Sequence, residues 1–75
     1  MKYIITASYE GTVSTVETND IEMLFKTFRS HIQAPHLCIT DGNTGEVLMH
    51  SGPEPYFTPS FMMLMMTWIL PQVYD

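Results

Sequence analysis

Residues 61–70 read Phe-Met-Met-Leu-Met-Met-Thr-Trp-Ile-Leu and lie between Pro59 and Pro71. A run this apolar has to be shielded from water, so it decides how the rest of the chain must be arranged. As a helix it would be about 15 Å long, half of the roughly 30 Å that a bilayer core requires. We therefore expect a helix that does not span a membrane, begins at Thr58-Pro59, ends at Pro71 and packs on a protein layer.

This helix would have two apolar sides, and a chain of 75 residues can cover only one of them. At about 100° per residue, one side carries the bulkier side chains, which suit packing on the chain's own sheet: Phe61, Leu64, Met65 and Trp68. The other side carries mostly methionine, a residue common on adaptable binding surfaces: Met62, Met63, Met66 and Leu70. A second copy of the chain or a groove on another protein would cover this side, and we predict that it is the interface of a homodimer.

Two stretches predict β-hairpins. Apolar and polar residues alternate from Lys2 to Tyr9, and Thr12 to Thr18 are rich in β-branched residues that favour strands. His36 to His50 form a second hairpin around the segment from Asp41 to Gly45, whose side chains and glycines suit a turn. Paired positions that sum to 86 would place two pairs on the apolar face of this hairpin: Leu37 with Met49, and Ile39 with Val47.

A helix is expected between the two hairpins. Asn19 and Glu22 form a variant of the helix-start box, which predicts a helix that begins near Asp20 and ends at Ala34-Pro35. Its apolar side chains form one stripe that should lie on the sheet: Ile21, Leu24, Phe25, Phe28 and Ile32.

The segment from Ser51 to Thr58 contains Pro53 and Pro55, so we expect an irregular crossing to the last helix. The resulting order, β-β-α-β-β-α, predicts one α+β domain over residues 1–75. Its sheet would be four-stranded and mainly antiparallel, with two helices on one face.

Acidic residues dominate the charge of the chain. Eight Asp and Glu against three Lys and Arg give a net charge of −5, the wrong sign for phosphate backbones, so we expect no direct nucleic-acid binding. Residues 30–75 contain no Lys or Arg, and three of their acidic side chains are candidates for contact with a basic protein partner: Asp41, Glu46 and Glu54. Because Cys38 is the only cysteine and the first residues lack a sustained apolar core, we expect a cytoplasmic protein without a signal peptide.

One group of side chains offers metal ligands. In the expected register His36, Cys38 and His50 lie on the same face of the hairpin, and imidazole and thiolate both bind zinc. Their spacing matches no familiar zinc motif, and a structural site would need a fourth ligand. A metal- or small-ligand-binding protein centred on these three residues is our alternative hypothesis.

The sequence contains no phosphate-binding glycine loop, no dinucleotide fingerprint and no carboxylate pair whose spacing indicates acid–base chemistry. We therefore expect no cofactor and no enzymatic activity. The leading hypothesis is a small non-enzymatic binding protein that acts through protein–protein contacts. One concrete version is an accessory protein of a phage or mobile element that inhibits a host nucleic-acid-binding defence enzyme.

Overall fold

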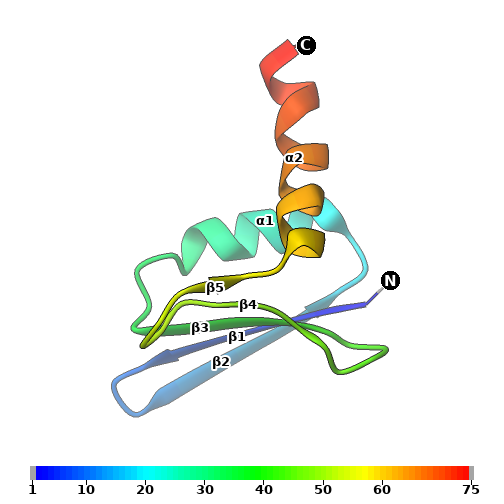
Figure 1. The fold of residues 1–75 in the computed structure, drawn as a ribbon. Coiled ribbons are helices and arrows are strands. Elements are labelled where there is room, and N and C mark those ends of the chain that lie inside the picture. Colours follow the sequence, from blue (N-terminus) through cyan, green and yellow to red (C-terminus); the bar gives the residue numbers. More distant parts are fainter. Residues whose placement is uncertain (1, 75) are drawn as a thin grey trace.

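The fold is one antiparallel sheet with both helices on the same face (Figure 1). The structure, a computed structural model, describes the backbone of residues 2–74 and the side chains of residues 2–69. The strands lie in the order β2-β1-β3-β4-β5. The elements are β1 (Tyr3–Tyr9), β2 (Thr12–Thr18), α1 (Ile21–Ser30), β3 (His36–Asp41), β4 (Val47–His50), β5 (Tyr56–Phe57) and α2 (Pro59–Tyr74). The predicted α+β class is confirmed, but the sheet has five strands rather than the expected four.

The first hairpin follows the alternation of its sequence. β1 and β2 pair in one continuous register, from Tyr3 opposite Thr18 to Tyr9 opposite Thr12. Gly11 adopts a φ of +71° in the connecting turn, a conformation that glycine takes without strain. The inward-facing side chains of β1 are buried in the core: Tyr3, Ile5 and Ala7.

Helix α1 begins near the predicted position but ends earlier than expected. Its N-cap is Asp20, whose Oδ1 accepts the N–H of Glu22 at 3.0 Å, so the predicted cap at Asn19 was wrong by one residue. The helix ends at Ser30, where the backbone N–H of His31 bonds back to the carbonyls of the last turn. The stripe is therefore buried at Leu24 and Phe25, whereas Ile32 lies beyond the helix and is 57% exposed.

The register of the second hairpin differs from the prediction by two positions. The turn closes between Asp41 and Glu46, whose backbone N–H and carbonyl are 2.8 Å apart, which shifts the pairing by one residue. A bulge then adds a second residue, because Ile39 pairs with Met49 while the next residue, Thr40, pairs with Val47. The shift turns Val47 outward, at 40% exposed, and leaves Leu48 3% exposed in the core, the reverse of the predicted faces.

The segment expected to be an irregular crossing contains a short edge strand. In β5, Tyr56 pairs with His50 and Phe57 pairs with Met49. Both prolines of the segment precede the strand, so they remove no N–H from its pairing with β4. This is the fifth strand of the sheet, which the prediction omitted.

Helix α2 extends beyond the residue that was expected to end it. It runs from Pro59 to Tyr74 and so passes through Pro71. A proline removes one helical N–H and crowds the carbonyl four residues earlier, but its own φ of about −65° is helical. The predicted end at Pro71 was wrong because a helix can continue past a proline with one hydrogen bond fewer.

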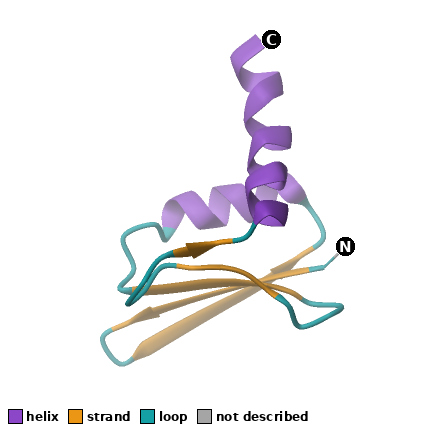
Figure 2. Cartoon of the chain, in the orientation of Figure 1, coloured by secondary structure: helices purple, strands orange, loops and turns teal. Residues whose placement is uncertain are grey.

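The core lies between the strand layer and the helix layer, which Figure 2 separates by colour. The ring of Phe25 is central to it, with centroid distances of 5.7 Å to Phe61 and 5.1 Å to Trp68. Helix α1 lies across the sheet, whereas α2 rises away from it (Figure 1). Only part of α2 can therefore pack on the rest of its own chain.

Candidate protein-protein interface

Helix α2 is fixed to the sheet at Thr58, the residue that precedes it. The hydroxyl of Thr58 accepts the N–H of Phe61 at 3.1 Å and donates to the carbonyl of Leu48 in β4 at 2.9 Å. Pro59 occupies the first helical position, where its missing N–H is not needed. The predicted Thr58-Pro59 helix start is confirmed, and this pair sets the position of every side chain further along α2.

The side of α2 expected to pack on the sheet packs on the core, although Trp68 does so against α1 rather than against the sheet. Phe61 is fully buried, and three further side chains pack against the core while remaining partly exposed: Leu64, Met65 and Trp68. The guanidinium of Arg29 in α1 lies 5.3 Å from the centre of the Trp68 ring.

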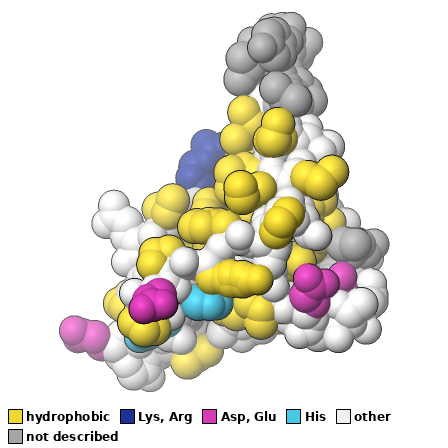
Figure 3. All heavy atoms as spheres, viewed as in Figure 1, with side chains coloured by type: hydrophobic (Ala, Val, Ile, Leu, Met, Phe, Trp, Pro, Cys, Tyr) yellow, Lys and Arg dark blue, Asp and Glu magenta, His cyan; other side chains and the backbone are white. Residues whose placement is uncertain are grey.

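The side of α2 assigned to an interface is exposed to solvent. Met62, Met63 and Met66 are 49%, 68% and 59% exposed, and Ile69 beside them is 39% exposed. We call these four residues the methionine surface; Figure 3 shows hydrophobic side chains gathered along α2. Leu70, also predicted to belong to this side, lies outside the residues whose side chains are described.

Ile69 was not among the predicted interface residues. It follows Phe61 by eight positions, which places it about 80° away around the helix, next to Met62. A helical wheel that included every residue of the run would have found it.

The methionine surface contains no charge, because α2 has no Asp, Glu, Lys or Arg between Pro59 and Tyr74. The hydroxyl of Thr67 donates to the carbonyl of Met63 at 2.9 Å, so this polar group of the helix is already bonded. What the surface offers a partner is apolar area and adaptable, polarizable methionine side chains.

The two aromatic residues of β5 lie near the base of α2. The ring of Phe57 is 6.1 Å from that of Phe61, as expected for an apolar residue that packs on the first turn of a helix. The ring of Tyr56 is 5.5 Å from that of His50. Both aromatic residues remain about half exposed, so they add to the apolar area beside the helix.

A groove lies between α2 and the β3–β4 hairpin. It has a volume of about 380 Å³, and Leu48, Met63 and Leu64 are among its lining residues. The carboxylates of Asp41 and Glu46 also line it, and we call it the acidic groove. Asp41 is only 7% exposed, and its Oδ1 accepts the backbone N–H groups of the turn.

Two of the three acidic residues proposed for electrostatic contact therefore share one groove. Glu54, the third, lies in the segment before β5 and is not part of the groove lining. In Figure 3, acidic side chains lie beside the base of α2.

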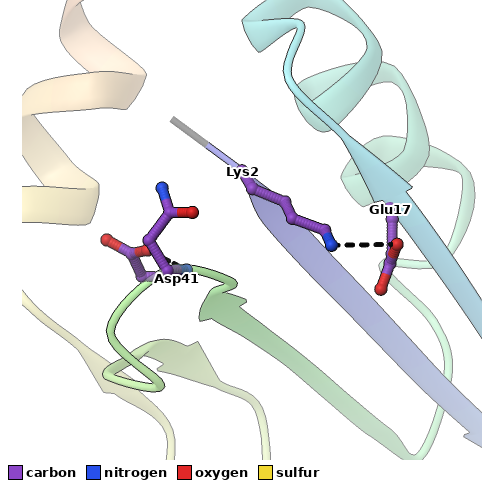
Figure 4. A network of polar contacts seen from close by, with 4 residues as sticks. Lys2, Glu17 and Asp41 are labelled. Carbon is purple, nitrogen blue, oxygen red and sulfur yellow. Dashed lines mark hydrogen bonds and ion pairs between the residues drawn. The ribbon is translucent and has the colours of Figure 1, made fainter.

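All three basic side chains of the chain are engaged elsewhere. Lys2 forms an ion pair with Glu17 at 3.4 Å, and Figure 4 shows its side chain extended away from Asp41. Lys26 pairs with Glu22 in α1 at 3.2 Å, and Arg29 lies over the Trp68 ring. Within residues 2–69, no lysine or arginine side chain is paired with the carboxylates of the acidic groove.

The three candidate metal ligands do not form a site. Cys38 lies opposite His50, but His36 lies next to Gly52, because the register is displaced by two positions from the expected one. The thiol of Cys38 contacts the hydroxyl of Thr40 at 3.7 Å. Among the described residues, no three His, Cys, Asp or Glu side chains are placed to hold a metal ion.

Comparisons with protein-family models, with curated proteins and with solved structures gave no match to this chain. None of the helices in the described part of the chain combines the length and the apolar character needed to cross a membrane.

Proposed function

We propose that this protein is a non-enzymatic binding protein that works through protein–protein contacts, as a homodimer whose subunits meet through the methionine surface. The observation that carries the proposal is the exposure of Met62, Met63 and Met66, between 49% and 68%, on a helix whose other side is already used by the core. Contiguous apolar area of this kind on a small protein usually marks an interaction site.

The absence of charge on α2 favours a second copy of the chain as the occupant of this surface. Each subunit carries a net charge of −5, so most faces of two copies repel each other when brought together. The methionine surface brings only uncharged side chains into contact. A twofold axis would place the same residues on both sides, and burial between subunits adds stability that a domain of this size lacks on its own.

Light scattering coupled to size-exclusion chromatography tests the homodimer. The wild-type protein is expected at twice the chain mass of 8.6 kDa. Met66→Glu would place a carboxylate at the centre of the interface, so this variant is expected at the monomer mass with an unchanged circular dichroism spectrum.

Met23→Glu is the matched control. Met23 is also a half-exposed methionine on a helix, but it lies on α1, away from the methionine surface, so the variant is expected to remain dimeric. A wild-type monomer at every concentration, or equal effects of the two substitutions, would contradict the proposed homodimer.

The partner that we propose for the dimer is a protein with a basic surface. The acidic groove shares Met63 with the methionine surface, but its carboxylates, Asp41 and Glu46, belong to the β3–β4 hairpin rather than to α2. A homodimer formed through the methionine surface would therefore cover one edge of the groove and leave its carboxylates open to solvent. A nucleic-acid-binding enzyme is one partner of this kind. The present protein would inhibit it, because its carboxylates would occupy basic sites that otherwise hold phosphate.

A further inference from the structure

We propose that the acidic groove is the site where this protein binds an arginine side chain of its partner. The inference rests on the proposed function, because it assumes a protein partner, and it specifies the chemistry of the contact. The groove lies at the edge of the core, where Leu48 and Leu64 line it, and it includes Met63 of the methionine surface.

The size and the apolar lining of the groove suit one long side chain. Its volume of about 380 Å³ is near the lower end of small-ligand pockets, which is too small for a helix but sufficient for a single residue. Leu48, Met63 and Leu64 would lie along the aliphatic part of an arginine, which readily packs on apolar surface while its charged end reaches a polar site.

The two carboxylates supply the polar site. The Oδ1 atom of Asp41 is held by the backbone N–H groups of Asn43 at 2.8 Å and Thr44 at 3.3 Å, which fixes the orientation of the carboxylate before any ligand arrives. Neither of these hydrogen bonds involves Oδ2, so this oxygen can accept a donor from a ligand. A guanidinium has several N–H donors, so it could donate one to Oδ2 of Asp41 and another to Glu46, and it loses less hydration than an ammonium, which favours arginine over lysine.

In the described part of the chain, no basic side chain competes with a ligand for the carboxylates of the groove. Lys2 and Lys26 are paired with Glu17 and Glu22, and Arg29 lies over Trp68. Asp41 and Glu46 therefore face the groove without a basic side chain of their own chain.

The larger groove between α1 and α2 does not carry the same inference. Its volume is about 510 Å³, and its lining includes Glu22, Lys26 and Arg29. Glu22 and Lys26 pair with each other, Arg29 lies on the aromatic ring of Trp68, and Asp20 accepts the backbone N–H of Glu22, so each of these groups already has a partner within the chain.

The test is a titration of the full-length protein with Nα-acetyl-arginine methylamide, followed by nuclear magnetic resonance of methyl and backbone amide groups. Saturable shifts are expected for the Met63 methyl group and for the amides of Leu48 and Glu46. The Met62 methyl group, on another side of α2, serves as an internal control and is expected not to shift. The citrulline analogue has nearly the same shape without the charge, and it is expected not to bind.

Three substitutions identify the carboxylates involved. Glu46→Gln should lower the association constant about threefold, the size expected for one exposed charge pair. Asp41→Asn keeps an acceptor for the turn but removes the charge, and it should lower the association constant about tenfold, because this carboxylate is more buried. Glu54→Gln removes an acidic charge outside the groove lining and is expected to change the association constant little.

Equal shifts with the citrulline analogue, shifts that do not saturate, or equal effects of Glu46→Gln and Glu54→Gln would overturn the arginine site. The proposed homodimer is read separately by light scattering. A wild-type monomer that binds the arginine probe would therefore contradict only the homodimer. A dimer that does not bind the probe would contradict only the arginine site.

Discussion

Replacing Thr58 by valine should weaken the attachment of α2 to the sheet while preserving the shape of the side chain; the backbone N–H of residue 58 still bonds the carbonyl of Leu48. The hydroxyl of Thr58 accepts the N–H of Phe61 and donates to the carbonyl of Leu48, and the residue is 5% exposed, so water cannot replace either bond. A helix cap and a buried hydrogen bond are each worth about 1 kcal/mol, so Thr58→Val should lower the free energy of unfolding by about 2 kcal/mol. In a domain of this size that corresponds to a fall of roughly 8–16 °C in Tm.

The measurement is urea unfolding followed by far-ultraviolet circular dichroism. All variants must be compared at one protein concentration, because dimerisation would make apparent stability depend on concentration. Thr58→Ser is the matched control: it keeps the hydroxyl and loses one methyl group, so it should lower the free energy of unfolding by only about 0.8 kcal/mol. Equal stability of the valine and serine variants would refute the role assigned to the hydroxyl.

Two further outcomes are expected. Phe61→Ala should lower the free energy of unfolding by about 3–5 kcal/mol, because it removes a fully buried ring, whereas Phe57→Ala, at a half-exposed neighbour, should lower it by about 1 kcal/mol. Similar losses in urea unfolding would show that Phe61 does not anchor α2. Elemental analysis of purified protein is expected to find no stoichiometric zinc; one zinc per chain that disappears in His50→Ala would restore the metal-binding hypothesis.

Features set by local sequence could be predicted well. The strict alternation of β1 places Tyr3, Ile5 and Ala7 on one face wherever the strand pairs, because neighbouring side chains must point to opposite sides of a sheet. Thr58-Pro59 is a start signal that depends on two adjacent residues. The two sides of α2 follow from helical spacing alone, and the burial of Phe61 against the exposure of Met66 agrees with it.

Features set by pairing between distant residues were predicted poorly. The register of β3 and β4 depends on where the turn closes and on a bulge at Leu48, and one extra residue exchanges the faces of a strand. β5 is only two residues long, so it has no periodicity to detect and forms because β4 offers a free edge. The misplaced register also explains why His36, Cys38 and His50 were expected to converge.

The acidic groove could not be predicted from the sequence for the same reason. Asp41 and Glu46 were singled out for their charge, but their position beside Met63 depends on the angle at which α2 leaves the sheet. That angle results from the contacts of Thr58 and Phe61 with other elements, and no local pattern encodes it.

Helix α2 divides two tasks between its sides, since the side chains that hold it in place and those that meet solvent are different residues. Substitutions at the outward positions would therefore leave the packing inside each subunit of the proposed homodimer intact and would change the contact between subunits. Selection could alter the contact between subunits without having to rebuild the interior of each one.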